Sequence, residues 1–188
     1  ETNFRRARVI LVNKANSAKP EDVQAVVAAA KEMNPSARVV LGASEVTVDN
    51  PGLVRGKRVL VIEDGPTLTH GGMAIGAGFI AAQKYEAAGL VDPRPYAKGS
   101  IRGVFEKFTQ LGKVLPAMGY YPEQLRELEE TINASDAECV LSGTPIDLTR
   151  VIKVSKPMAR VRYELKDMGD SSLRAYVLDF LKEKKLAK

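Results

Sequence analysis

Short apolar runs alternate with amphipathic segments along the whole chain, and this alternation limits the possible folds most. Val59-Leu60-Val61-Ile62 is a continuous apolar run, as expected for a strand that is covered on both faces. Residues 122–134 carry apolar side chains at helical spacing. The alternation predicts an α/β fold with a mainly parallel sheet and helices on both faces, in three layers. We expect strands at 9–12, 38–41, 59–62, 114–118, 139–142 and 158–165, and helices at 20–34, 71–88, 101–111, 122–134 and 171–185.

The segment Asn13-Lys14-Ala15-Asn16 follows the first predicted strand and resembles the Asn-Lys-x-Asp element of P-loop GTPases, which grips the purine base. In that element the Asn braces the site, the Lys stem covers the ring, and the carboxylate accepts hydrogen bonds from guanine. Here Asn16 replaces the carboxylate, and an amide is both a donor and an acceptor. The resemblance implies a nucleotide site at Asn13, Lys14 and Asn16 that favours ATP over GTP.

The sequence has no Gly-x-x-x-x-Gly-Lys-Ser/Thr loop, the element that holds nucleotide phosphates. It opens with Glu1 rather than Met, and the following residues resemble neither a signal peptide nor a transit peptide. We therefore expect the C-terminal portion of a longer P-loop NTPase, with the missing N-terminal P-loop region as a partner. The polar stretch at 46–55 suggests a division into a nucleotide-domain remnant at 1–50 and a C-terminal α/β domain at 51–188.

Composition narrows the choice of partners. The formal charge of +5 and the pI of about 9.3 suit an anionic small ligand. Nucleic acid is not expected, because clustered Lys and Arg with interleaved aromatic residues are absent. Nor is a membrane, since no segment reaches the roughly 18 apolar residues that span one. The single Cys139 excludes an intramolecular disulfide and is interpreted as a buried strand thiol, which fits a cytoplasmic protein.

Glu63 and Asp64 stand at the end of the most apolar predicted strand, where ligands bind in open α/β sheets. Two adjacent carboxylates could hold Mg²⁺, and His70 could bind phosphate or shuttle a proton. Thr67 precedes His70, and glycines 71 and 72 at an expected helix start would admit a phosphate. The alternative is a purely structural turn, in which Asp64 caps a helix and His70 lies at the surface.

Two further turns carry residues suited to an anionic substrate. One displays Arg94, Tyr96, Lys98 and Ser100 between prolines and a helix start, and the other contains Thr144 and Arg150. The alternative for the first turn is an ordinary rigid connection with solvated charges, and the alternative for the second is a capped turn. The functional interpretation predicts that His70, Arg94, Lys98 and Arg150 converge on one anion site that faces Glu63 and Asp64.

Several longer phrases resemble the family of predicted GTPases that includes cyclic 2,3-diphosphoglycerate synthetase. They are Glu-Thr-Asn at 1–3, Val-Asn-Lys at 12–14, Val-Leu-Val-Ile-Glu-Asp-Gly-Pro-Thr-Leu-Thr-His-Gly-Gly at 59–72, Val-Asp-Pro-Arg-Pro-Tyr at 91–96, Leu-Pro-Ala-Met-Gly-Tyr at 115–120 and Gly-Thr-Pro-Ile-Asp-Leu at 143–148. The resemblance implies ATP and Mg²⁺ as cofactors and phosphorylation of 2,3-diphosphoglycerate followed by ring closure. Such a reaction requires chiefly positioning and charge neutralisation.

Two other function classes stay open on the sequence alone. One is a GTPase switch, in which hydrolysis signals rather than synthesises. The other is a non-catalytic domain that binds an anionic metabolite. Gly76 and Gly78 also permit a close helix contact, either within the chain or in a homo-oligomer.

Overall fold

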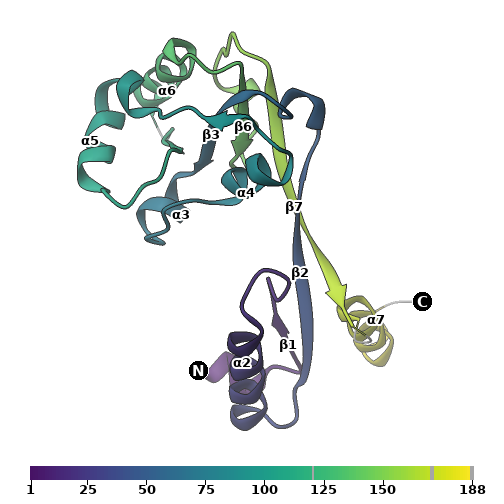
Figure 1. The fold of residues 1–188 in the computed structure, drawn as a ribbon. Coiled ribbons are helices and arrows are strands. Elements are labelled where there is room, and N and C mark those ends of the chain that lie inside the picture. The colour runs from purple at the N-terminus through teal and green to yellow at the C-terminus, as the bar shows by residue number, and fades with distance from the viewer. Residues whose placement is uncertain (120, 170–171, 187–188) are drawn as a thin grey trace. The chain divides into compact units, whose positions relative to one another are not determined.

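The computed structural model describes residues 1–119, 121–169 and 172–186. The chain divides into two compact units (Figure 1). Unit 1 comprises Glu1–Glu45 with Tyr163–Lys188, and unit 2 comprises Val46–Arg162. The division falls inside the two longest strands, β2 (Arg38–Val48) and β7 (Met158–Met168). Each unit is described by itself.

Unit 2 is built on β3 (Arg58–Asp64), which lies between β6 (Cys139–Gly143) on one side and both β4 (Gly89–Leu90) and β5 (Leu115–Ala117) on the other. All these pairs are parallel, and β6 also pairs in parallel with the start of β7. A strand in the middle of such a sheet is buried on both faces, and residues 59–63 of β3 are accordingly buried.

Helices cover both faces of β3. Helix α4 (Ala77–Lys84) packs close to the Val61 side chain. Strand alternation turns Leu60 and Ile62 to the other face, and both are fully buried. The helices α5 (Gly99–Lys107) and α6 (Pro122–Ala134), which contact each other, supply Ile101 and Leu128 to the same core cluster.

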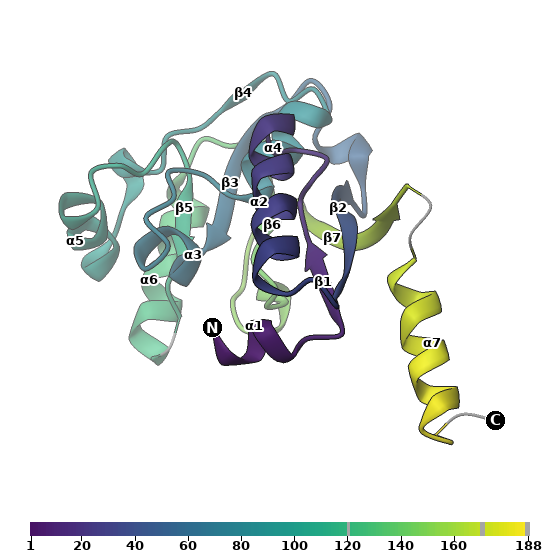
Figure 2. The same cartoon turned by 90° about the horizontal axis from the view of Figure 1, so that it is seen from below.

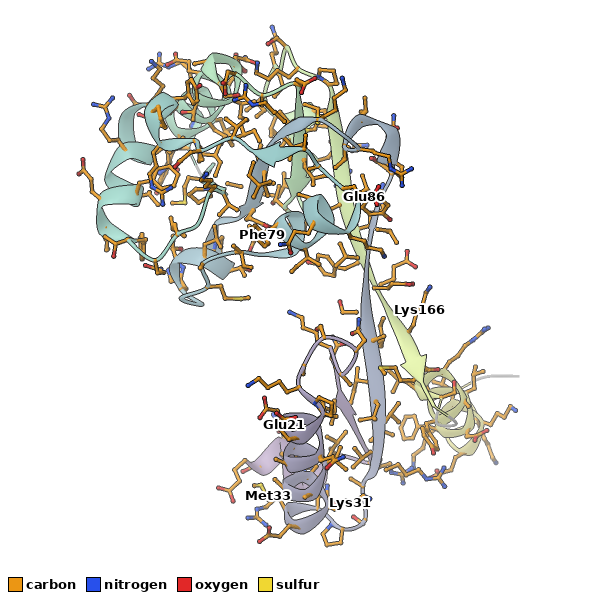
Figure 3. All side chains as sticks on the ribbon, in the orientation of Figure 1. Glu21, Lys31, Met33, Phe79, Glu86 and Lys166 are labelled. Atoms are coloured by element: carbon orange, nitrogen blue, oxygen red, sulfur yellow. The ribbon has the colours of Figure 1, made fainter. Side chains whose placement is uncertain are left out.

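In unit 1 the strand β1 (Val9–Val12) pairs in parallel with β2, starting from Val9 opposite Arg38. Helix α2 (Pro20–Met33) lies along β1, and α7 (Leu173–Glu183) lies on the other side of these strands (Figures 1 and 2). The side chains of Glu21, Lys31 and Met33 project from α2 (Figure 3). A short helix α1 (Thr2–Arg6) precedes β1. The remaining short elements are α3 (Gly65–Thr69), η1 (Pro51–Leu53), η2 (Arg94–Tyr96) and η3 (Leu148–Arg150).

Strands β2 and β7 run antiparallel. The Asp49 N–H donates to the Arg160 carbonyl, and farther along the pair the Lys166 ammonium donates to the Glu45 carboxylate. Asp49 is thus opposite Arg160 and Glu45 is near Lys166, so residue numbers rise along β7 as they fall along β2, as they do in an antiparallel pair. The sheet is therefore mixed but mostly parallel.

The predicted α/β class with a mainly parallel sheet is confirmed. The helix expected at 71–88 is wrong in extent, because α4 covers only Ala77–Lys84. Gly72 has a positive φ of 65° and stops a continuous helix there. Strands β2 and β7 extend beyond their expected ends at 41 and 165.

The last part of the chain, from Tyr163 onward, belongs to unit 1, whereas the sequence placed it in the same domain as 51–162. Ser171, where a helix was expected to begin, lies outside the described residues, and α7 begins at Leu173. None of the helices in the described ranges combines the length and apolar character that a bilayer crossing needs.

Candidate functional site

Strands β3, β5 and β6 end at one edge of the unit 2 sheet. The chain leaves β3 through α3 and α4 and returns in β4, on one side of β3. It leaves β5 through α6 and returns in β6, on the opposite side of β3. The loops after β3 and β5 thus diverge to different faces of the sheet. Ligands in open α/β sheets bind at such a divergence point, so the carboxyl ends of β3 and β5 form the candidate site.

Glu63 is the most heavily engaged side chain of this edge. It is 1% exposed, and its carboxylate accepts three backbone N–H groups. Oε1 accepts from Gly76 at 3.1 Å and Phe79 at 2.7 Å, and Oε2 accepts from Gly78 at 3.1 Å. These donors are the N-cap and first turn of α4, where a negative charge is favourable. Phe79 marks this turn in Figure 3.

The pKa of Glu63 is raised above its ordinary value because burial disfavours the charged carboxylate, while the three N–H donors act in the opposite direction. Glycines surround the carboxylate: a Cβ at Gly76 or Gly143 would lie 2.5 or 2.6 Å from Oε2. The carboxylate therefore fills the anion position at the start of α4. The sequence expected a phosphate at a helix start at 71–72, but the helix begins later and Glu63 occupies its donors.

Asp64 caps the short helix α3. Its Oδ2 accepts from the Thr67 N–H at 3.2 Å and from the Thr67 hydroxyl at 2.8 Å. Both bonds use Oδ2, and within the described residues no hydrogen bond reaches Oδ1. The helix-capping role that was the alternative interpretation of Asp64 is therefore present. It involves Oδ2 and does not use Oδ1.

His70 is exposed at the end of α3, with Nδ1 3.1 Å from the Thr69 hydroxyl. That hydroxyl donates its single proton to the Gly65 carbonyl at 2.9 Å. The contact with His70 then requires the Nδ1–H form of the imidazole, because a hydroxyl has one proton to give.

At the end of β6, Gly143 stands opposite Glu63 in the parallel register, so the following Thr144 lies beside the same edge. Thr144 is buried, and its hydroxyl accepts from the Ile146 N–H at 3.4 Å. Arg150 is exposed, with its Nε 3.5 Å from Asp147. Hydrogen bonds from Thr149 and the nearby Arg160 guanidinium lower the pKa of Asp147.

The loop from 92 to 100 is held mainly by other parts of unit 2. Arg94 pairs with Asp92 at 3.0 Å, donates to the Leu111 carbonyl and lies over the Phe105 ring. The Tyr96 hydroxyl bonds to Asp136, which also pairs with Arg58, the first residue of β3. Tyr96 therefore lies at the amino edge of the sheet, opposite the candidate site.

The next two predicted residues of this loop bond to α6. The Lys98 N–H donates to the Thr131 hydroxyl at 3.1 Å, and Ser100 bonds to Glu127 through both its N–H and its hydroxyl. The loop follows β4, which pairs only with the first two residues of β3, so it leaves the sheet near the amino edge. The structure brings Glu63, Asp64, Thr67 and Thr144 to one edge, and it does not support a single anion site that includes the 94–100 loop.

The predicted base-binding turn lies in unit 1, directly after β1. The Lys14 N–H donates to Asn13 Oδ1 at 2.8 Å, and Lys14 itself has a positive φ of 60°. Asn16 Oδ1 accepts from the Ser44 N–H at 3.0 Å, which ties the turn to β2. Base recognition by Asn13, Lys14 and Asn16 at this turn stays a prediction.

The role of Gly76, Gly78 and Phe79 as backbone donors to Glu63 was not predicted from the sequence. The available signal was Gly-x-Gly before a small-residue helix, a pattern that permits close backbone approach. Cys139 is buried as expected, and burial raises the pKa of its thiol. Within the described residues, no three His, Cys, Asp or Glu side chains gather closely enough to form a metal centre by themselves.

Comparison with known proteins adds one informative similarity. No family model matches the sequence. The chain is 51% identical over 182 residues, 97% of its length, to a protein named arginine synthetase ArcE from Thermococcus kodakarensis. It spans 41% of the length of that relative.

Proposed function

We propose that the chain is part of an ATP-dependent synthetase that forms arginine. The observation that carries the proposal is the 51% identity to arginine synthetase ArcE over almost the whole chain. The α/β architecture, with its divergent loops at the ends of β3 and β5, offers a ligand site of the usual kind for such chemistry.

Formation of a guanidinium group from a ureido group replaces an oxygen atom by nitrogen. The oxygen is a poor leaving group until it is phosphorylated, so a nucleotide supplies a phosphoryl group and ammonia then displaces phosphate. Such transfer depends on positioning and on neutralisation of phosphate charge. The family resemblance implied a different product, cyclic 2,3-diphosphoglycerate, whose formation requires the same kind of phosphoryl activation. Formation of that compound is therefore the alternative that the experiment must distinguish from arginine formation.

The proposal gives the predicted residues separate roles. Asn13, Lys14 and Asn16 contact the nucleotide base in unit 1. In unit 2, Thr67, His70, Thr144 and Arg150 contact the substrate or its phosphoryl group. Glu63 is a positioning residue, since its carboxylate holds the start of α4.

Asp64 would hold Mg²⁺ through Oδ1, because Oδ2 already accepts from Thr67 and carboxylate oxygens are ligands that this ion prefers. The ion would neutralise phosphate charge. Asp64 itself orients Thr67 through Oδ2 and keeps the turn after β3 in place.

The test uses the longest natural form of the protein that contains this chain. It is incubated with ATP, Mg²⁺, ammonium and the ureido analogue of arginine, and arginine is measured by amino-acid analysis. A parallel reaction with 2,3-diphosphoglycerate is followed by phosphorus NMR. Arginine formation that requires ATP supports the proposal, whereas cyclic diphosphoglycerate without arginine refutes it. Asp64→Asn should reduce arginine formation, and Asp22→Asn on the exposed start of α2 should not.

A further inference from the structure

Unit 1 lacks a hydrophobic core of its own. The buried apolar cluster of the described residues lies wholly between Val48 and Val161, within unit 2. In the described part of unit 1, the buried apolar side chains are Val12, Ala30 and Val40. So few buried side chains do not stabilise a unit of this size by themselves.

Strand β1 has the composition of a central strand but the position of an edge. All four of its residues, Val-Ile-Leu-Val, are apolar, as in strands covered on both faces. Within the described residues β1 pairs only with β2, and the first three of its residues are half-buried. An apolar edge of this kind is a template for another strand.

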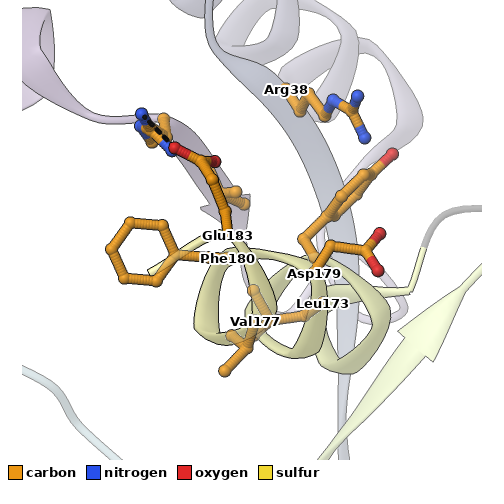
Figure 4. A pocket seen from close by; sticks show the side chains of 9 residues that line it. Arg38, Leu173, Val177, Asp179, Phe180 and Glu183 are labelled. Carbon is orange, nitrogen blue, oxygen red and sulfur yellow. Dashed lines mark hydrogen bonds and ion pairs between the residues drawn. The ribbon is translucent and has the colours of Figure 1, made fainter. Parts of the chain in front are cut away.

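Helix α7 likewise has apolar side chains that nothing in the described part of unit 1 covers. It contains no buried residue, and Val177, Leu178 and Phe180 are 47%, 42% and 40% exposed. A cavity of about 480 Å³ lies between the helix and the first residues of β1 and β2, beside the contacts of Arg8 with Phe180 and of Arg38 with Tyr176. Arg8 and Arg38 line this cavity together with Val177 and Glu183 of α7, and Glu183 pairs with Arg8 (Figure 4).

We propose that a second polypeptide segment, corresponding to the part of ArcE that this chain does not span, docks on unit 1. It continues the sheet past β1 and covers the exposed side of α7. Unit 1 leaves the free edge of β1 and the outer side of α7 uncovered, and the chain spans only 41% of the length of ArcE. The proposal depends on the length of the relative and not on which reaction it catalyses.

The charge of α7 identifies the chemistry of the occupant. The sequence of the helix and of the residues that follow it contains five basic residues and two acidic ones, namely Arg174, Lys182, Lys184, Lys185 and Lys188 against Asp179 and Glu183. A second copy would bring two net-positive surfaces together, which is unfavourable. The docking segment is therefore an apolar strand and surface with acidic residues at its rim.

Hydrogen–deuterium exchange tests the proposal. The exchange of the backbone amides of β1 and α7 is measured in the 188-residue chain alone. It is measured again with the complementary polypeptide, which is the segment that corresponds to the part of ArcE outside this chain, either fused in the natural order or added separately. We expect fast exchange in the chain alone and a slowing of about tenfold or more on docking. Amides of β3 serve as the internal control and should not change.

Leu178→Asp should abolish the slowing at α7, because it places a carboxylate in the covered surface. The matched control is Ile80→Asp, at a position on α4 of unit 2 that is 45% exposed, and it should leave docking intact. Slow exchange in the chain alone would overturn the proposal by showing that unit 2 or a second copy covers unit 1. Fast exchange with and without the complementary polypeptide would overturn it as well.

Discussion

The Glu63→Gln substitution tests the structural role of the carboxylate at the end of β3. Glutamine keeps the length of the side chain but replaces one oxygen by an NH₂ group. In its better orientation the amide oxygen accepts from Gly76 and Phe79, and the NH₂ group faces the Gly78 N–H, which also donates. One buried backbone donor is then unpaired, at a cost of about 1–3 kcal/mol.

The substitution also removes a negative charge from the start of α4, which costs about 0.3–1 kcal/mol. Relief of carboxylate burial offsets part of both losses, as the raised pKa of Glu63 indicates. We therefore expect the free energy of unfolding to fall by about 2 kcal/mol at neutral pH. Urea denaturation followed by circular dichroism measures the change, with Glu123→Gln on the exposed start of α6 as the control.

The pH dependence gives an independent check. Because the pKa of Glu63 in the folded chain lies above its ordinary value of 4.5, the folded state keeps this proton to higher pH than the unfolded chain. Its contribution to the free energy of unfolding therefore falls as pH rises from about 4.5 through the folded pKa. Glu63→Gln should remove this component. A variant as stable as the wild type at neutral pH, with an unchanged pH profile, would refute the capping role.

Nucleotide hydrolysis, nucleotide preference and the packing around Gly143 can each be tested separately. The 188-residue chain alone should not hydrolyse ATP or GTP at an enzymatic rate, because it lacks a phosphate loop; metal-dependent phosphate release in a malachite-green assay would contradict this. In the longest natural form, Asn16→Asp should shift nucleotide preference from adenine towards guanine by about tenfold to a hundredfold in calorimetric titrations, and tighter GTP binding by the wild type would count against the base-binding role. Gly143→Ala should lower the free energy of unfolding by about 1–3 kcal/mol in urea denaturation, because the new Cβ would lie 2.6 Å from Glu63 Oε2 and 2.9 Å from the Gly78 nitrogen; an unchanged urea midpoint would show that this edge can relax.

Local sequence determined the elements whose signals are complete within one segment. Helix α6 has the predicted bounds, because Pro122 suits a first turn and Leu128 and Ile132 form one apolar face. The centre of β3 follows from its run of four apolar residues, which only a doubly covered strand can bury. The α/β class follows from the order of these elements along the chain.

The tertiary structure alone decided which distant groups meet. The sequence placed Glu63 at a strand end, but only the packing of α4 shows that its carboxylate is enclosed by the backbone donors of Gly76, Gly78 and Phe79. Likewise, the register of β4 with the start of β3 sends Tyr96 to the amino edge. Local periodicity specifies a strand or a helix and its buried face, whereas register and packing depend on contacts between residues far apart in the chain, which one sequence does not encode as a local pattern.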